Sequence, residues 1–421
     1  MKIAIIHSNL DGRGGSQRYA IEIAKEFKNS GNDVDIYAYH YDKSCYPELI
    51  EGLKVNAVYE NETMPDMSKL TKKIIASPLY KLWIVLGLDF LAVIFDTSKN
   101  SKKIASIIGN NYDIIFAHEE PLSVWAATEI KKKYNIPVAW FCYDTILKWY
   151  VEWPKQEMYR NPLRKFILKH IFFKFDRIKI DRFVDRSYVL DTGMKKKFKS
   201  LYNSKPKIQR GGISTNEIFT DQRLKKIHEK YNLKHSTKII SCVSRFLPYK
   251  RIDDLILAYS ELDESIRNNT VLYINAPIAD KFYYNQCRKL SAESKSPKRI
   301  IIDTEISPSE NNLLEIYSST DVFVFPNEKQ TWGHAPIEAM AHGVIAIVSD
   351  ETGISELIRK ISPYVYKCKN IKELTQKLSL ALLKNHENKQ IVKKQYELIK
   401  YLSWERICQD YISDFRDIIK K

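Results

Sequence analysis

The stretch from Phe325 to Glu356 constrains the fold of this chain more than any other part of the sequence. One apolar run, Asp321–Phe325, leads into it, and a second, Val344–Val348, lies inside it; both are typical of buried parallel strands. Between them Pro336–His342 is predicted to be a helix, because a proline opens it and a glycine follows its end. The sequence therefore predicts a strand, a loop, a helix and a strand, the unit from which parallel α/β sheets are built.

The loop before that helix, Asn327–Ala335, has the chemistry of a nucleotide-sugar site. In open α/β sheets ligands bind at the carboxyl ends of the strands, where this loop is expected. The N–H groups and the positive dipole end of the helix suit a phosphate. Glu338, expected in the first turn, suits a phosphate poorly, but its carboxylate can accept hydrogen bonds from paired hydroxyls such as those of a ribose.

Composition sets broad limits on the class of protein. A length of 421 residues and a hydrophobic fraction of 44% predict a globular chain of two or three domains. The six cysteines are scattered without a Cys-x-x-Cys spacing, and Lys2–His7 is a strand pattern with no leader before it, so we expect reduced thiols and a cytoplasmic location. The net charge of +16 predicts an anionic partner. No compact nucleic-acid motif is recognisable, which favours phosphorylated ligands or an acidic membrane face over RNA or DNA.

Glu338–Gly343 (EAMAHG) resembles the donor-binding signature of the family 4 retaining glycosyltransferases of the GT-B fold. In that family two Glu are separated by seven residues, and the second is followed by Ala-Met-Ala-x-Gly. The first Glu falls at Gln330 here. The resemblance implies an α/β fold of two Rossmann-like domains facing across a cleft. It also implies transfer of a sugar from a nucleotide diphosphate with retention at the anomeric carbon and without a metal or other cofactor.

The same resemblance assigns further residues of the expected site. It implies donor contacts for the loop Asn327–Ala335 with the start of the helix after it, and for a glycine pair after the first strand. Gln17 stands where the family commonly has Glu. His118 matches the family's His beside the donor sugar, and Arg245 and Lys250 match its diphosphate pair. The donor-binding set is therefore Gly14, Gly15, Arg245, Lys250, Gly333, His334, Ala335 and Glu338, and the catalytic set is His118, Arg245, Lys250 and Gln330.

Each of these residues also has a structural interpretation. A glycine loop is often only a tight turn, a lone histidine is usually a core residue, and basic residues at a strand end are usually solvated. Gln17 and Asp144, which follows the predicted strand Ile136–Phe141, are expected near the acceptor. Asp144 has the plainer alternative of a polar strand end.

Gln330 is the main departure from the family. The amide keeps the hydrogen-bonding geometry of a glutamate and loses its charge, so a positively charged sugar ring would be stabilised less. Losing one electrostatic interaction that stabilises the transition state costs about 3 kcal/mol, or roughly 100-fold in rate. Glu328 is near enough in sequence to substitute if the loop is remodelled. A catalytically weakened partner subunit is therefore the alternative to an active transferase, with a nucleotide-sugar epimerase and a nucleic-acid-binding protein as further rivals.

Two segments have the character of membrane-contact helices. Residues 79–95 are apolar but contain Lys81 and Asp89, which argues against a membrane span and leaves a core helix or a membrane-surface helix. Residues 160–183 are predicted to form a basic amphipathic helix suited to anionic lipid headgroups, with a solvated basic face or RNA binding as alternatives.

The predicted domains are an acceptor domain over 1–207, a donor domain over 208–400, and a last helix over 401–421 that packs back on the acceptor domain. Tyr39–Tyr46 resembles mannosyltransferases that extend lipid-linked oligosaccharides, with an aromatic surface loop as the alternative. That likeness favours GDP-mannose over a UDP-hexose as donor, and a glycan or lipid-linked acceptor.

Overall fold

The computed structural model describes residues 1–61, 76–86, 89–119, 121–144, 162–214, 225–304, 310–329, 332–383 and 385–420. Two compact units make up the chain: Met1–Arg210 together with Trp404–Lys421, and Gly211–Ser403. These limits lie close to the boundaries expected at 207 and 400. Within the described parts of the chain no helix is long and apolar enough to cross a membrane.

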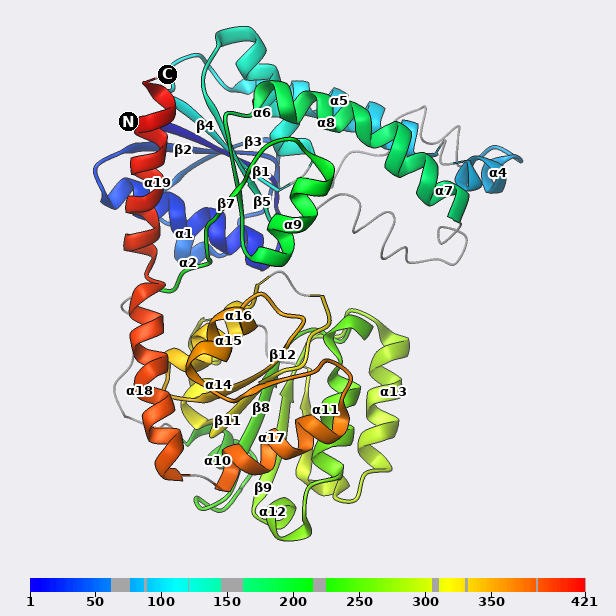
Figure 1. Cartoon of the computed structure of the whole chain (residues 1–421), viewed down its shortest axis with the longest axis vertical. Coiled ribbons are helices and arrows are strands. Elements are labelled where there is room, and N and C mark those ends of the chain that lie inside the picture. Colours follow the sequence, from blue (N-terminus) through cyan, green and yellow to red (C-terminus); the bar gives the residue numbers. More distant parts are fainter. Residues whose placement is uncertain are drawn as a thin grey trace. The chain divides into compact units, whose positions relative to one another are not determined.

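A parallel sheet of seven strands forms the centre of the first unit, in the order β3-β2-β1-β4-β5-β6-β7 (Figure 1). The strands at its middle carry apolar residues on both faces and are almost wholly buried, as parallel strands covered by helices on both sides require. The strands are β1 (Lys2–Leu10), β2 (Asp33–Tyr41), β3 (Lys54–Glu60), β4 (Ile114–His118), β5 (Val138–Cys142), β6 (Arg186–Val189) and β7 (Lys207–Ile208).

Helices cover this sheet, and the last of them comes from the end of the chain. α19 (Trp404–Ile419) lies along α1 (Gly15–Asn29), where the ring of Phe27 packs on Phe415 and the hydroxyls of Tyr19 and Tyr411 are 2.8 Å apart (Figure 1). The other helices are α2 (Pro47–Ile50), α4 (Tyr80–Val85), α5 (Asp89–Ile107), α6 (Leu122–Tyr134), α7 (Pro162–Ile167), the π-helix η3 (Leu168–Phe172), α8 (Phe173–Phe183) and α9 (Thr192–Leu201).

The second unit repeats this design with a six-stranded parallel sheet, in the order β10-β9-β8-β11-β12-β13. Its strands are β8 (Lys238–Val243), β9 (Thr270–Asn275), β10 (Ile300–Asp303), β11 (Val322–Phe325), β12 (Ile345–Ser349) and β13 (Val365–Tyr366). Its helices are α10 (Lys226–Lys230), η5 (Pro248–Lys250), α11 (Ile252–Ser260), α12 (Glu264–Asn268), α13 (Lys281–Ala292), η6 (Pro297–Arg299), α14 (Glu310–Ser319), α15 (His334–Ala341), α16 (Ser355–Ile361), α17 (Ile371–Leu383) and α18 (Asn385–Tyr401). The predicted α/β class with two Rossmann-like units is confirmed.

Three predicted helices differ from those observed. α15 begins at His334 rather than Pro336, because Gly333 is the extended residue that caps it, so Glu338 lies beyond the first turn. Residues 79–95 form parts of two helices, α4 and α5, and residues 162–183 form α7, η3 and α8. Arg164, 1% exposed, connects these helices, because it donates to the Ile84 carbonyl in α4 and pairs with Asp89 at the start of α5. Residues 87–88 and 160–161 lie outside the described ranges.

Gly343 after α15 gives a test of this packing. Its φ of +72° is strained for other residues, and a Cβ there would lie 2.8 Å from the Tyr396 hydroxyl. We expect Gly343→Ala to lower the free energy of unfolding by about 1–2 kcal/mol, measured by urea unfolding. Gly109→Ala, where an added Cβ meets nothing within 4 Å and φ is not positive, is the control and should change little. Equal effects of both substitutions would contradict the packing described for Gly343.

Candidate active site

Three loops of the second unit meet at the carboxyl ends of β8, β11 and β12, which are neighbours in the sheet. The Glu328 amide donates to the Tyr249 carbonyl over 2.8 Å, which ties the loop after β11 to the loop after β8. The Ser349 hydroxyl, at the end of β12, donates to the Asn327 carbonyl over 2.5 Å. Residues far apart in sequence are thereby held at one edge, where ligands of open α/β sheets bind.

Arg245 and Lys250 both lie in the loop after β8. Arg245 is exposed and forms no hydrogen bond or ion pair with the described residues. The Lys250 ammonium, partly buried, lies 5.0 Å from the ring centre of Tyr249 and 5.8 Å from that of Phe325. Aromatic faces hold a cation in place without neutralising it. The loop after β8 therefore brings two positive side chains to this edge of the sheet.

Arg251, the next residue, has a structural role. Its backbone is left-handed, with φ of 49°, and its guanidinium donates two hydrogen bonds to Asp254, of 2.8 and 2.5 Å. Those carboxylate contacts raise its pKa against the opposing effect of burial. Of the three basic residues in this loop, Arg251 therefore holds the start of α11, whereas Arg245 and Lys250 are candidates for binding a ligand.

The start of α15 supplies main-chain donors beside these cations. Gly333, His334 and Ala335 are its cap and first two residues, whose N–H groups the helix itself does not use, as at every helix start. Close packing fixes them, since a Cβ on Gly333 would lie 2.9 Å from the Phe325 ring. Such a helix start favours a negative charge.

Glu338 lies one turn further along α15 and is only 9% exposed. The buried Tyr317 hydroxyl donates to its Oε2 over 2.7 Å, which fixes the carboxylate and uses part of its capacity to accept hydrogen bonds. Sequence reasoning missed Tyr317, because nothing in the pattern of α14 distinguishes a hydroxyl aimed at a carboxylate from a core ring.

The loop after β11 contains a second missed residue, Asn327. It is fully buried, yet neither its amide oxygen nor its amide nitrogen has a hydrogen-bond partner among the residues that the structure describes. Gln330 lies outside the described residues. Glu328, considered as its substitute, accepts a 2.8 Å hydrogen bond from Lys369 and lies 3.9 Å from the Lys329 ammonium. It is therefore already neutralised by lysines.

In the first unit His118 ends β4 and is completely buried. Its ring stacks on Phe141, and its Nδ1 lies 2.8 Å from the Tyr143 hydroxyl. Burial, with nearby His7 as a smaller cause, holds the pKa of His118 well below its usual value, so the ring is neutral. In this conformation His118 is a core residue, and the expected sugar contact stays a prediction.

The glycine loop after β1 is built around Gln17. A Cβ on Gly14 would lie 2.3 Å from the Gln17 Oε1, so only glycine permits this side chain to fold back on the start of α1. The Gln17 amide then donates to the Asn9 carbonyl over 3.2 Å. Gly15 is the first residue of the helix. The loop and Gln17 thus stabilise each other, while any contact with donor or acceptor stays a prediction.

Asp144 lies two residues after the end of β5. It is partly buried, and its carbonyl accepts from the Cys142 thiol over 3.2 Å. More prominent at this sheet edge is Glu119, which sequence reasoning passed over. Its Oε1 accepts a 2.5 Å hydrogen bond from Ser16 and lies 3.7 Å from His7 Nε2. Its position beside His118 in the sequence was the only available signal.

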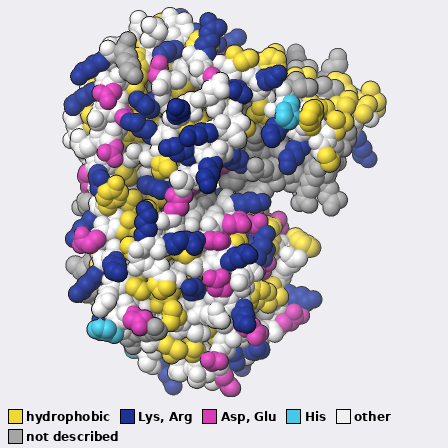
Figure 2. Space-filling view, viewed as in Figure 1, with side chains coloured by type: hydrophobic (Ala, Val, Ile, Leu, Met, Phe, Trp, Pro, Cys, Tyr) yellow, Lys and Arg dark blue, Asp and Glu magenta, His cyan; other side chains and the backbone are white. Residues whose placement is uncertain are grey.

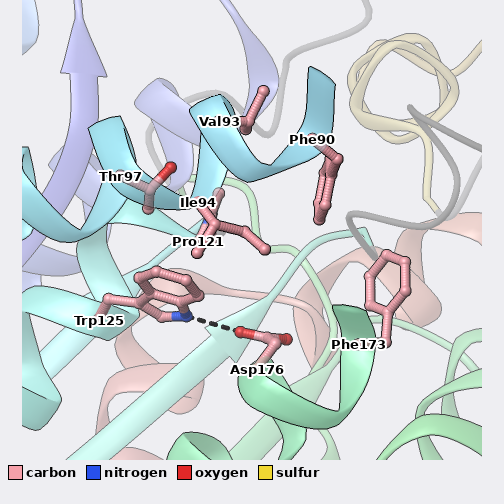
Figure 3. Close-up of a pocket in the computed structure, with 8 residues that line it drawn as sticks. All are labelled: Phe90, Val93, Ile94, Thr97, Pro121, Trp125, Phe173 and Asp176. Atoms are coloured by element: carbon pink, nitrogen blue, oxygen red, sulfur yellow. Dashed lines mark hydrogen bonds between the residues drawn. The ribbon is translucent and has the colours of Figure 1, made fainter. Parts of the chain in front are cut away.

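An apolar pocket lies elsewhere in the first unit, between α5, α6 and α8 (Figure 3). The carboxylate of Asp176 faces it, and both of its oxygens accept a hydrogen bond: Trp125 Nε1 donates to one over 2.6 Å and the Tyr202 hydroxyl to the other over 2.5 Å. Burial raises the pKa of Asp176. The rest of the lining is Phe90, Val93, Ile94, Thr97, Pro121 and Phe173. This is not the lining that a nucleotide diphosphate requires.

Metal ligation finds no support in the described ranges, where no three His, Cys, Asp or Glu side chains cluster with metal-site geometry. All six cysteines are free thiols, five of them buried.

Tyr317 offers a test of the Glu338 environment. We expect Tyr317→Phe to lower the free energy of unfolding by about 1–2 kcal/mol, because a largely buried carboxylate loses its donor. Tyr284→Phe is the matched control, since the Tyr284 ring packs on Phe246 and its hydroxyl has no hydrogen bond to the described residues. Denaturant unfolding measures both variants. An unchanged free energy of unfolding in Tyr317→Phe would show that the carboxylate does not depend on this hydroxyl.

The family model "Glycosyl transferases group 1" matches residues 224–398, and the model "Glycosyltransferase Family 4" matches residues 13–179. One relative is the alpha-1,3/1,6-mannosyltransferase ALG2 of Kluyveromyces lactis, 25% identical over 399 residues, which are 85% of this chain and 71% of that protein. Another is the N-acetyl-alpha-D-glucosaminyl L-malate synthase of Bacillus anthracis, 24% identical over 35% of this chain and 38% of its own length.

Solved structures resemble the chain over its whole length. The crystal structure of Anabaena Alr3699/HepE with UDP and glucose aligns with a TM-score of 0.72 and 12% identity, covering 99% of this chain and 100% of that one. At that identity the likeness shows the fold. With family models matching both halves and this fold, the chain is a glycosyltransferase of the family 4 type with the GT-B fold.

Proposed function

We propose that this glycosyltransferase transfers a hexose from a nucleotide-diphosphate sugar to a glycan or lipid-linked acceptor, with retention and without a metal. The observation that carries the proposal is the sheet edge of the second unit. Arg245 and Lys250 lie at this edge together with the start of α15. The carboxylate of Glu338, which accepts a hydrogen bond from Tyr317, lies one turn further along that helix. A nucleotide diphosphate offers the complementary groups, namely phosphate charge and a ribose diol.

The chemical difficulty in such a transfer is the charge on the departing diphosphate. Arg245 and Lys250 are placed on one loop, and the main-chain donors of Gly333, His334 and Ala335 on the next. Cations and helix dipoles at such a position stabilise negative charge as it develops on the leaving group. In the mechanism that we propose, a leaving phosphate oxygen takes the acceptor proton, so that no metal and no protein base is needed.

Gln330 bears on the rate rather than on the type of reaction. The lysine contacts of Glu328 argue against its taking over the role of the family's first glutamate. A weakened, non-transferring partner subunit is the second candidate, favoured by Gln330 alone. Gln330→Glu separates the two: we expect a faster transfer reaction with the same donor, and no gained activity would favour the partner subunit.

Mannose from GDP-mannose is the preferred substrate in this proposal. It is supported by the similarity to the ALG2 mannosyltransferase over 85% of this chain. UDP-hexoses are the alternative, since the HepE structure holds UDP and glucose. A transfer assay with GDP-mannose and UDP-glucose, read out by the anomeric configuration of the product, decides both the donor and the stereochemistry.

We also propose that the enzyme works on a membrane face, on the cytoplasmic side. Large apolar side chains are exposed at the α4–α7 end of the first unit and along α8, among them Leu82, Phe166, Phe175 and Ile178 at 51–61% exposure. Figure 2 shows hydrophobic side chains gathered there with Lys and Arg side chains beside them. Residues 162–210 contain 15 Lys and Arg but only 4 Asp and Glu. Exposed apolar side chains among cations suit an anionic lipid surface.

For the donor site we expect Arg245→Met and Lys250→Met each to lower kcat/KM by roughly 100-fold, because each removes one charge that stabilises the leaving group. Lys289→Met, an exposed lysine on α13, is the control and should have no effect. Steady-state transfer with GDP-mannose measures all three. Full activity in both loop variants would refute the assigned diphosphate contacts.

For the membrane surface we expect Phe175→Ser with Ile178→Ser to weaken binding to vesicles containing anionic phospholipid at least 10-fold, since two exposed apolar anchors are lost. Phe282→Ser, a 74% exposed phenylalanine on α13 in the second unit, is the matched control. Sedimentation with the vesicles measures the binding. If Phe282→Ser weakens binding as much, the α8 surface is not the membrane contact.

A further inference from the structure

We propose that Glu119 is the carboxylate that binds the acceptor: it accepts a hydrogen bond from the acceptor's sugar hydroxyls at the carboxyl end of β4. The inference rests on the proposed transfer reaction and names a residue for its acceptor side. It follows from where Glu119 lies, how its backbone is held, and which charges surround it.

Glu119 is the residue of this strand end that reaches solvent. His118 before it is fully buried among aromatic rings, with its Nδ1 beside the Tyr143 hydroxyl. The Glu119 side chain is 28% exposed, enough for a ligand to reach the carboxylate while most of it stays fixed. β4 pairs with β1 and β5, so Glu119 lies near the middle of the ligand-binding edge of the first sheet.

The backbone of Glu119 is held in a strained conformation. Its φ of 69° is in the left-handed region, which costs a residue with a Cβ free energy. Two hydrogen bonds to its carbonyl keep it there, from the Ser123 hydroxyl over 2.8 Å and from Trp140 Nε1 over 3.1 Å. Strain that the surroundings enforce on a polar side chain is typical of functional sites.

The carboxylate has no lysine or arginine partner in the described parts of the chain. Its contacts are the Ser16 hydroxyl, at 2.5 Å from Oε1, and the buried His7, at 3.7 Å. Glu48, another carboxylate of the same unit, is different, since Arg13 donates to both its oxygens over 2.8 and 3.0 Å. An ionised carboxylate can accept about four hydrogen bonds, so Glu119 has acceptor capacity left for hydroxyls.

These features fit a neutral polyol rather than an anion. In the transfer step the acceptor oxygen bonds to the anomeric carbon while the bond from that carbon to the diphosphate oxygen breaks. The acceptor proton passes to the leaving phosphate. Glu119 orients the acceptor and takes no proton in the balance of the reaction.

The left-handed backbone allows a test that separates function from folding. Glu119→Gln keeps the shape and removes the charge, whereas Glu119→Gly removes the side chain but suits φ of 69°, so that it should fold at least as well. With GDP-mannose and octyl α-mannoside, we expect kcat/KM for the acceptor to fall about 10- to 100-fold in both variants, as for a lost hydrogen bond to a charged group. The KM for GDP-mannose should stay within about 2-fold. Glu129→Gln on α6, a carboxylate near Lys132 and Lys179, should behave as wild type.

An unchanged acceptor kcat/KM in Glu119→Gly would overturn the assignment. A higher KM for GDP-mannose in place of a lower acceptor kcat/KM would overturn it as well. A loss in Glu119→Gly that comes with a lower unfolding temperature, and is absent in Glu119→Gln, would show a structural role and overturn it too. If the wild-type chain transfers no sugar from any nucleotide donor, the proposed function itself fails, and this inference with it.

Discussion

All strands paired in either sheet run parallel, and that constraint determines where chemistry can occur in this chain. Parallel strands end at one edge, so the residues that follow β8, β11 and β12 meet although about a hundred residues separate the first from the last. The apolar runs that make these strands cannot carry function, because they are buried on both faces. The charged groups of the candidate site lie in the edge loops, where main-chain contacts such as that between Glu328 and Tyr249 hold the loops together.

The carboxyl-end edges of the two sheets carry side chains of different charge. In the second unit Arg245 and Lys250 lie beside a helix start, and the carboxylate of Glu338 is set apart by Tyr317. In the first unit the groups at the edge are a neutral buried His118 and an ionisable Glu119 without a lysine or arginine partner among the described residues. In the proposed reaction the edge of the second unit binds the anionic leaving group and the edge of the first unit binds the acceptor hydroxyls.

Much of this arrangement could be predicted from the sequence, because strand and helix periodicity and the glycines and prolines at element ends are local signals. The donor loop, Arg245 and Lys250 were located in this way and by resemblance. What failed were features that depend on tertiary contacts. The contact between buried Arg164 and Asp89 and the π-helical segment η3 are such features, because the local sequence pattern shows neither of them. Likewise, Tyr317 and Glu119 acquire their roles only from partners distant in sequence.

Binding of a nucleoside diphosphate tests the central claim most directly. Thermal unfolding of the whole chain would be followed with GDP, UDP and ADP, each in large excess. A ligand at about 100 times its dissociation constant adds roughly 2.7 kcal/mol of stability, which a melting curve resolves. The account predicts that at least one nucleotide raises the unfolding temperature in wild type and fails to do so in Lys250→Met. If no nucleotide changes the melting curve, the sheet edge of the second unit is not a nucleotide-sugar site.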